Sequence, residues 1–374
     1  MIKRHILQQI EENLFRWKVI IIYWARQVGK TTLSKKILEK YWDNYSYFNC
    51  DEPDIRELFR NKTSLELKNL VWEKKIIIID EAQRVENIWL TLKLIVDNFP
   101  QIQIIATWSS SFELANKTNE PLTWRKYEYH LFPFSIYELK QLYTEIELKR
   151  LLEERMIFWN YPVVFNKSLK EKIRDLKLLT DSYLFKDILS FWKIKKPDLI
   201  VKLLKALALQ IWSQVSYTEL SNLIWINKNT VESYISILEQ SFVIFRLESF
   251  SRNLRNELKF SKKIYFYDNW IRNALINNFN SIELRQDSWA LWENLLLSER
   301  LKYISNNILY RNIYFWRNHA QAEIDYIEEY NWRLYTYEFK WWNKKAKIPK
   351  SFDEAYPWSN FEIINRDNFL KFIL

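Results

Sequence analysis

The chain has 374 residues, of which 48% are hydrophobic and 27% charged, and a formal net charge of +10. This composition excludes a disordered chain, and no apolar run approaches the roughly 18 residues of a membrane span. The single cysteine, Cys50, excludes an internal disulfide and a cysteine-based zinc site, and the three histidines are scattered. We therefore expect a cytoplasmic globular protein of two or three domains, without a membrane partner.

Glycine and tryptophan are the abnormal part of the composition. Gly occurs once, although an ordinary usage of about 7% would give roughly 26, whereas Trp occurs 19 times. Several tryptophans stand in polar, turn-like contexts where glycine is usual: Trp17, Trp42, Trp72, Trp225 and Trp332. A tryptophan-rich protein with aromatic surfaces is the alternative, although Trp normally seeks burial.

We interpret most of these tryptophans as UGA codons that the source organism reads as glycine. Three are interpreted as genuine tryptophans: Trp292, Trp316 and one of the adjacent pair at 341–342, which we expect to be Trp341. Gly29 would then come from an ordinary glycine codon.

The first chemical motif lies near the N-terminus. Residues 1–18 predict an amphipathic helix and not a signal peptide, because Lys, Arg, Glu and Gln are mixed with apolar residues. The apolar run at 18–23 is typical of a buried parallel strand, and a helix-like run follows at 33–41. Between them, with Trp24 read as glycine, the chain matches the phosphate-loop pattern G-x-x-x-x-G-K-[ST]. The predicted nucleotide-binding residues are Trp24, Ala25, Arg26, Gln27, Val28, Gly29, Lys30, Thr31 and Thr32.

This loop predicts ATP and Mg²⁺ as cofactors. Its backbone N–H groups would hold the phosphates, as they do wherever such a loop opens a helix. Lys30 would reach the β- and γ-phosphates, and the Thr31 hydroxyl would bind Mg²⁺. The alternative is a chance match in a lysine-rich loop, which the flanking strand and helix disfavour.

A second motif, IIIIDEAQ at residues 76–83, supports the first. Four isoleucines predict another central strand. Asp80 at its carboxyl end would hold Mg²⁺ through water, and Glu81 would orient and deprotonate the attacking water. An acidic helix N-cap is the alternative interpretation.

A third predicted strand, residues 103–107, ends in a serine-rich segment. Thr107 or Ser109 would sense the γ-phosphate, or the segment is an ordinary serine-rich turn. Further on, Arg125 could touch the γ-phosphate, touch the nucleotide of a neighbouring subunit, or be a solvated arginine.

These segments resemble prokaryotic AAA-type ATPases that carry a C-terminal domain of unknown function. The resemblance covers nearly the whole chain and is carried by YWARQVGKTT, IIIIDEAQ, IIATWSSSFEL and LTWRKYEYHLFPFSIYEL. It implies glycine where this chain has Trp24, Trp108 and Trp124, which independently supports the glycine interpretation. The resemblance implies ATP hydrolysis, with an undefined biological role.

The middle of the chain, from 133 to about 253, is predicted to be helical. We expect a lid helix at 134–152 and a winged helix at 198–250, with Trp225 in its turn. The residues that open the second helix could face a DNA major groove: Lys228, Asn229 and Thr230. The alternative, a winged helix used for protein contact, is favoured because Glu232 and Glu239 lie on the same helix.

The last third carries its own acidic pattern. A helix from residue 290 contains Glu299, and two predicted strands carry Asp325 and then Glu338 and Lys340. Period-two alternation places Glu338 and Lys340 on one face. This order resembles the core of PD-(D/E)xK nucleases, in which Asp325 and Glu338 would share Mg²⁺, Glu299 would support them and Lys340 would position water. A charged antiparallel pair on an ordinary sheet is the alternative.

The sequence therefore predicts an α/β protein with three parts. Residues 1–145 would form a P-loop AAA-type ATPase domain with a parallel sheet, 146–253 a helical lid and winged-helix region, and 254–374 a nuclease-like α/β domain. The predicted function is Mg-dependent ATP binding and hydrolysis that drives a conformational switch. An ATP-gated protein-interaction switch with a catalytically dead nuclease fold, or an ATP-licensed DNA nuclease, remain alternatives. ATP is the predicted ligand, while DNA, a protein partner and self-association are left open.

Overall fold

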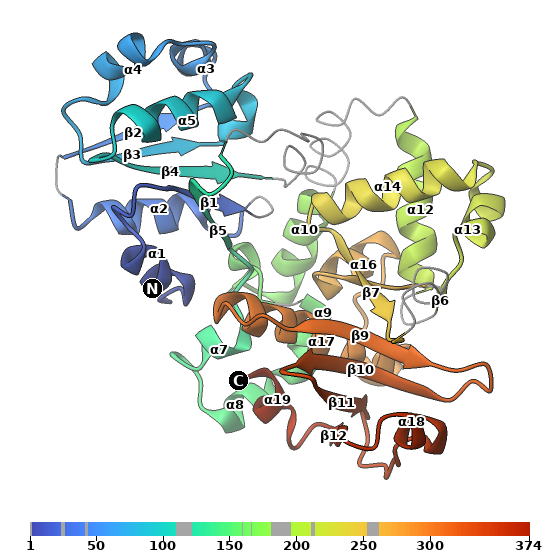
Figure 1. Cartoon of the computed structure of the whole chain (residues 1–374). Coiled ribbons are helices and arrows are strands. Elements are labelled where there is room, and N and C mark those ends of the chain that lie inside the picture. The colour runs from blue at the N-terminus through green and yellow to red at the C-terminus, as the bar shows by residue number, and fades with distance from the viewer. Residues whose placement is uncertain are drawn as a thin grey trace. The chain divides into compact units, whose positions relative to one another are not determined.

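The computed structural model describes residues 2–23, 27–41, 44–109, 122–158, 160–165, 167–180, 196–210, 214–252 and 262–374. The chain divides into two compact units, Met1–Phe134 and Ser135–Leu374. Figure 1 colours them from blue to cyan and from green to red. Each unit is described by itself.

The first unit is built on a five-stranded sheet in the order β2-β3-β4-β1-β5. All four strand pairs are parallel. The strands are β1 (Val19–Tyr23), β2 (Tyr45–Asn49), β3 (Ile76–Asp80), β4 (Gln103–Trp108) and β5 (Lys126–His130). Because β1, β3 and β4 are almost continuous apolar runs, they are buried along their whole length in the centre of the sheet. The predicted α/β class with a parallel sheet is confirmed.

Helices connect the parallel strands β1 to β4, as crossover connections require: α2 (Lys30–Leu38), α3 (Pro53–Phe59), α4 (Ser64–Val71) and α5 (Ile88–Asn98). Another helix, α1 (Ile6–Glu12), precedes β1. α1 ends before the predicted limit at residue 18. Parallel strands all end at one edge, so this edge receives the start of α2, the end of β3 and the end of β4.

The second unit begins with short helices and not with the single lid helix predicted at 134–152. α7 (Ile136–Leu139) and α8 (Glu145–Arg150) are separate helices, followed by α9 (Leu152–Phe158). The reason is local: Ser135 and Thr144 each form a capping box with the glutamate three residues on, so two helices start where one was expected.

Eight further helices of this unit are described, and the longer ones among them begin with α10. They are α10 (Leu169–Leu179), α12 (Pro197–Leu209), α13 (Tyr217–Ile224), α14 (Lys228–Gln240), α16 (Asn269–Leu275), α17 (Ser288–Asn306), α18 (Lys350–Ala355) and α19 (Phe369–Ile373). α13 and α14 are joined through Trp225, which ends α13 in a left-handed conformation. Whether this helix pair is a winged helix stays a prediction.

A seven-stranded sheet forms the centre of the second unit, in the order β12-β11-β10-β9-β7-β8-β6. Its strands are β6 (Gln214–Val215), β7 (Ile244–Ser249), β8 (Lys262–Phe266), β9 (Asn312–Arg317), β10 (Glu323–Tyr330), β11 (Arg333–Phe339) and β12 (Asn360–Ile364). Figure 1 shows β9 to β12 side by side in orange and red. The sheet runs across residue 253, where we placed a domain boundary, and the three-part division stays a prediction.

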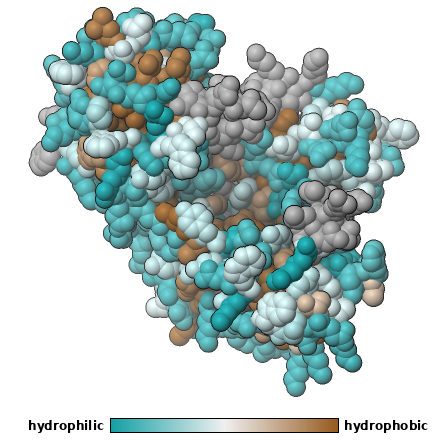
Figure 2. Space-filling view, viewed as in Figure 1, coloured by the Kyte–Doolittle hydropathy of each residue, from teal (hydrophilic) through white to brown (hydrophobic). Residues whose placement is uncertain are grey.

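The visible face of each unit is mostly hydrophilic, with small apolar patches (Figure 2). Helix α17 is an exception to the usual amphipathic pattern, because residues on all of its sides are buried. Among the helices that the structure describes, none has both the length and the hydropathy of a membrane span.

Four tryptophans have a left-handed backbone that disfavours any residue with a Cβ atom. Their φ angles lie between 57° and 65°, and their exposed fractions between 72% and 92%. They are Trp17, Trp124, Trp225 and Trp332. Glycine would relieve the strain at each of these positions.

Other tryptophans have ordinary surroundings. Trp72 has a helical φ of −59°, so its backbone does not require glycine, although we expected glycine there. Trp292 is buried, with ring centroids 5.4 Å from Trp341 and 5.6 Å from Phe369. Trp316 packs on Phe352 at 5.0 Å. Trp24 and Trp42 lie outside the described residues.

Candidate functional site

The phosphate loop joins β1 to α2 at the carboxyl edge of the first sheet. Its described part begins at Gln27, because three of the predicted residues lie outside the described ranges: Trp24, Ala25 and Arg26. Gln27 and Gly29 have left-handed backbone, with φ of 62° and 98°, and Val28 between them is buried. α2 begins immediately after Gly29, so its first N–H groups, which have no partner within the helix, face the loop.

Lys30 opens α2 and is only 6% exposed. Its Nζ atom donates to the backbone oxygen of Trp108 at 3.3 Å and lies 3.2 Å from Oε1 of Glu81. The next two residues, Thr31 and Thr32, are exposed in the first turn of the helix. Lys30 therefore contacts the carboxyl ends of two strands, through Glu81 directly after β3 and Trp108 at the end of β4.

Asp80 is the point at which three strands and α2 meet. The hydroxyl of Thr31 donates to Oδ2 of Asp80 at 3.3 Å, and the hydroxyls of Tyr47 and Thr107 also donate to this carboxylate. Burial and the hydrogen bond to Asp80 raise the pKa of Tyr47. Thr31 and Asp80, the predicted Mg²⁺ ligands, therefore lie next to each other, and Thr107 is in contact with them.

Glu81 has a left-handed backbone with φ of 53°, and its N–H donates to Oγ1 of Thr107 at 3.0 Å. Nε2 of Gln83 donates to Glu81 at 2.5 Å and to Ser109 at 2.7 Å. Burial alone would raise the pKa of Glu81, but the charge of Lys30 and hydrogen bonds from Gln83 and Ser109 outweigh it, so the pKa is lowered. Glu81 is therefore ionised at neutral pH, as a general base must be.

Arg125 lies at the opposite edge of the sheet from this site. It immediately precedes β5, whose first residue pairs with Val19 at the start of β1, whereas the phosphate loop follows Tyr23 at the other end. A five-residue strand separates the two edges by about 16 Å. Nε of Arg125 contacts Oδ1 of Asp97 at 2.6 Å. The prediction that Arg125 touches the γ-phosphate of its own site is therefore wrong. Contact with the nucleotide of a neighbouring subunit and a solvated arginine stay open as interpretations.

Comparison with known proteins finds family models that match parts of the chain. Residues 16–140 match the model of an AAA domain. Two further matches cover residues 149–282, a domain of unknown function called DUF8612, and residues 290–368, a domain of unknown function called DUF4143. The AAA match and the phosphate loop in its parallel sheet support an AAA-type P-loop ATPase.

Similar full-length proteins are known from distant organisms. An uncharacterized protein of Methanocaldococcus jannaschii is 24% identical over 80% of this chain and 73% of its own length. One of Haemophilus influenzae is 23% identical over 84% of this chain and 86% of its own. Among solved structures, the Thermotoga maritima RuvB Holliday junction branch migration motor has 16% identity and a TM-score of 0.31 over 65% of this chain and 87% of that one.

In the second unit, Asp325 and Glu338 lie on neighbouring antiparallel strands. Each is one residue beyond the paired Tyr326 and Tyr337 of β10 and β11. The backbone N–H of Phe339 donates to Oδ2 of Asp325 at 2.8 Å. Nζ of Lys340 lies 2.6 Å from Oε1 of Glu338. The structure therefore brings together these three predicted residues.

A helical glutamate completes this group, but it is Glu293 and not Glu299. The hydroxyl of Tyr265 donates to Oε1 of Glu293, and Nζ of Lys263 lies 3.2 Å from the same atom. Burial raises the pKa of Asp325, and the charges of Glu293 and Glu338 raise it further against the opposing effect of Lys263. Such mutual influence places these groups in one electrostatic environment.

Glu299 lies elsewhere on α17. Its carboxylate accepts the backbone N–H of Ile136 at 2.7 Å and contacts Nζ of Lys302 at 2.7 Å. Since Glu293 and Glu299 are six positions apart, they project from different sides of the helix. The predicted supporting role of Glu299 is therefore corrected. Nothing in the sequence marks Glu293 over Glu299, because the choice depends on which side of α17 faces β8.

We call this group the carboxylate cluster: Glu293, Asp325, Glu338, Lys263 and Lys340. Lys263 also forms an ion pair with Glu323. Across the described ranges, no three His, Cys, Asp or Glu residues are grouped so that they could hold a metal ion. The ammonium groups of Lys263 and Lys340 lie beside these carboxylates and partly neutralise their negative charge.

The helix pair in the middle of the chain presents two of its three predicted groove-facing residues. Lys228 and Asn229 are exposed at the start of α14. The hydroxyl and backbone N–H of Thr230 both donate to the capping side chain of Asn227, at 2.8 and 2.7 Å. Thr230 thus serves the helix end.

Proposed function

We propose that the chain binds Mg-ATP at the carboxyl edge of the first sheet, hydrolyses it, and changes conformation as it does so. The proposal rests on one observation, the contact network that joins Lys30, Thr31, Asp80 and Glu81. We call these four residues the nucleotide site. The residue types fit the ligand, because a lysine and helix N–H groups bind phosphate, and hydroxyl and carboxylate oxygens are ligands for Mg²⁺.

The chain's own residues suggest how hydrolysis would proceed. Phosphate would compete with Glu81 for Lys30, since both are anions within reach of one ammonium group. Release of Glu81 from this ion pair would free its carboxylate to orient a water molecule and accept its proton. Bound Mg²⁺ would supply charge neutralisation at the phosphates. Thr107 contacts Asp80 and the backbone N–H of Glu81, and Ser109 accepts a hydrogen bond from Gln83. These contacts support a role for Thr107 or Ser109 in sensing the γ-phosphate.

The decisive experiment separates binding from hydrolysis. In Glu81→Gln, we expect fluorescent ATP to bind at least as tightly as to the parent, because Lys30 loses its competing carboxylate, while phosphate release falls at least a hundredfold. The control is Glu39→Gln, which lies beyond the end of α2 and is exposed. Turnover by Glu81→Gln at the parent rate would show that another group is the base.

We also propose that the natural protein carries glycine at Trp24 and at most other tryptophan positions. The four left-handed, exposed tryptophans support this, because such a backbone is strained for a bulky side chain and unstrained for glycine. The test is mass spectrometry of peptides from the native host. Glycine at positions 24 and 225 is expected, and tryptophan at either position would contradict the interpretation.

A second proposal concerns the nuclease-like unit, for which we favour an ATP-gated interaction switch without DNA cleavage. The observation that favours it is Lys263, whose buried ammonium contacts Glu293 and Glu323 and so takes the place near the carboxylates that a metal would need. The competing proposal is an ATP-licensed DNA nuclease, with exposed lysines near the site as duplex contacts: Lys344, Lys345, Lys347 and Lys350. Nicking of supercoiled plasmid in Mg²⁺ or Mn²⁺ that Glu338→Gln abolishes would establish the nuclease.

A further inference from the structure

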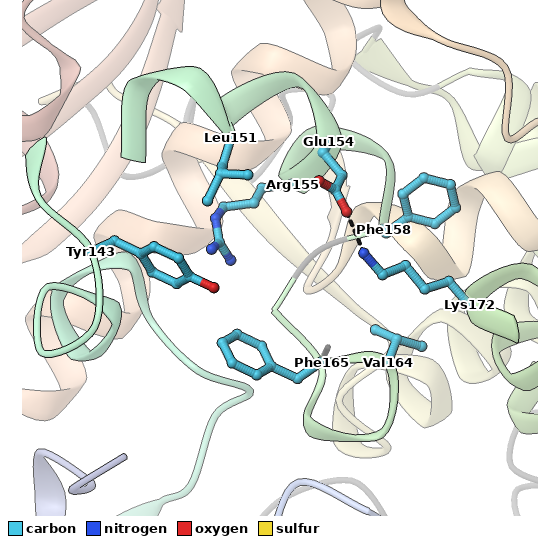
Figure 3. A pocket seen from close by; sticks show the side chains of 8 residues that line it. All are labelled: Tyr143, Leu151, Glu154, Arg155, Phe158, Val164, Phe165 and Lys172. Atoms are coloured by element: carbon cyan, nitrogen blue, oxygen red, sulfur yellow. Dashed lines mark hydrogen bonds and ion pairs between the residues drawn. The ribbon is translucent and has the colours of Figure 1, made fainter. Parts of the chain in front are cut away.

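A cavity of about 150 Å³ lies in the second unit, between α9, the turn after it and α10. Figure 3 shows its lining. Four apolar side chains provide much of the wall: Leu151, Phe158, Val164 and Phe165. A cavity of this volume can hold a molecule about the size of benzene.

A buried arginine is turned into this cavity. Arg155 of α9 is 7% exposed, and Figure 3 shows its guanidinium group directed toward the hydroxyl of Tyr143. Its carbon Cζ lies 5.2 Å from the centroid of the Tyr143 ring. Burial lowers the pKa of Arg155, partly against Tyr143, which is hydrogen-bonded to it, and against the nearby charges of Glu154 and Glu299. Within the described part of the chain, no carboxylate forms an ion pair with it, and a buried cation in that state is costly.

Two buried donors beside the cavity lack acceptors. Nη1 of Arg155 donates to Oδ1 of Asn160, which is fully buried. Nε of Arg155 and Nδ2 of Asn160 find no hydrogen-bond partner in the part of the chain that the structure describes. Since buried polar groups are nearly always hydrogen-bonded, these two donors mark the surroundings of Arg155 as short of acceptors.

The opposite wall carries an ion pair with donors to spare. Lys172 of α10 contacts Glu154 of α9, drawn as a dashed line in Figure 3. An ammonium group has three donors, and this contact takes one of them. Arg155 and Lys172 against Glu154 leave the lining with one positive charge in excess. That balance suits one negative charge and disfavours a dianion such as phosphate.

We propose that this cavity binds a monocarboxylate with a small apolar body. The carboxylate would accept two hydrogen bonds from Arg155, whose planar guanidinium group matches it, and would remove the unpaired charge. The apolar body would lie against Leu151, Phe158 and Phe165. Such a ligand could be a free organic acid or the C-terminal residue of a peptide, since both present the same chemistry. This inference does not depend on the nucleotide site.

Calorimetric titration of the full chain with benzoate tests the proposal, with benzamide as the uncharged probe of the same shape. Benzoate should bind at one site, and benzamide at least tenfold more weakly. Gly-Gly-Leu with a free C-terminus, and the same peptide amidated, distinguish the two sources. Binding of the free peptide but not its amide identifies a peptide end, and binding of benzoate alone identifies a free acid.

Two variants give the control. Arg155→Met should lose benzoate binding, whereas Arg150→Met, which removes an exposed arginine from α8, should bind as the parent does. If circular dichroism shows that Arg155→Met does not fold, Lys172→Met should still weaken benzoate several-fold. Equal binding of benzoate and benzamide, unchanged binding in the folded Arg155→Met or Lys172→Met protein, or no binding of any probe overturns the proposal.

Discussion

The nucleotide site and the carboxylate cluster contain the same kind of contact in two different settings. Lys30 lies 3.2 Å from Glu81, and Lys263 lies 3.2 Å from Glu293. Lys30 starts a helix at the edge of a parallel sheet, beside a loop that can receive phosphate. Lys263 is 1% exposed and is held by Glu323 as well. We therefore expect an ion pair to mark a ligand site only where a ligand can replace one partner.

The largest effect is expected where the ion pair cannot be exchanged. Lys263→Met keeps most of the length of the side chain but leaves the buried Glu293 without its cation and Glu323 with Arg317 alone, and should lower the free energy of unfolding by about 3–5 kcal/mol. Urea denaturation measures this change. The control is Lys262→Met, whose exposed pair with Glu248 should matter by less than about 1 kcal/mol. Equal stability of both variants would mean that the cluster is hydrated.

The same change in the nucleotide site should act on binding. Lys30→Ala is expected to weaken Mg-ATP binding on the order of a hundredfold, because charge-assisted contacts to phosphate are lost. Lys36→Ala, an exposed lysine of the same helix, should bind normally. Fluorescent ATP titration distinguishes them. If Lys30→Ala bound ATP as tightly as the parent, the contrast between the two regions would fail.

A second buried ion-paired group, Glu328, should make the stability of the protein depend on pH. Glu328 is fully buried between Arg300 and Arg311, whose hydrogen bonds and charges lower its pKa in spite of burial. A lowered folded pKa stabilises the protein above the unfolded value of about 4.3, and this contribution is lost as the pH falls through the folded pKa.

Glu328→Gln should therefore lower the free energy of unfolding by about 3 kcal/mol at pH 7, and the difference from the parent should shrink below about pH 4. Denaturation curves at pH 7 and at about pH 3 check this. The control is Glu329→Gln, which changes the half-exposed neighbouring glutamate and should have little effect on the free energy of unfolding at either pH. A difference that stays constant with pH would contradict the assigned cause.

The nucleotide site was more accessible to sequence reasoning than the carboxylate cluster. The phosphate loop and Asp80-Glu81 are local patterns at strand ends, and parallel strands end at one edge, so their meeting follows from the fold class. Tyr47 was missed, because no motif marks it, and Gln83 stands in the second motif but was given no role. In the cluster, Glu299 was chosen where Glu293 belongs, since only the packing of α17 against β8 decides between them. The split of the predicted lid helix could have been found from the two S/T-x-x-E patterns at Ser135 and Thr144.

The smallest expected effect tests the tryptophans themselves. Trp225 ends α13 with φ of 57° and is 92% exposed, so its side chain has little contact to lose. Trp225→Gly should raise the free energy of unfolding by about 1 kcal/mol, because glycine adopts this conformation without strain. Trp72→Gly is the matched control. Trp72 is exposed at a helix end but has a helical φ of −59°, so glycine there should lower stability by up to about 1 kcal/mol. Opposite signs in urea denaturation tie the effect to the backbone, whereas stabilisation by both changes would mean that removal of exposed indole matters more than φ.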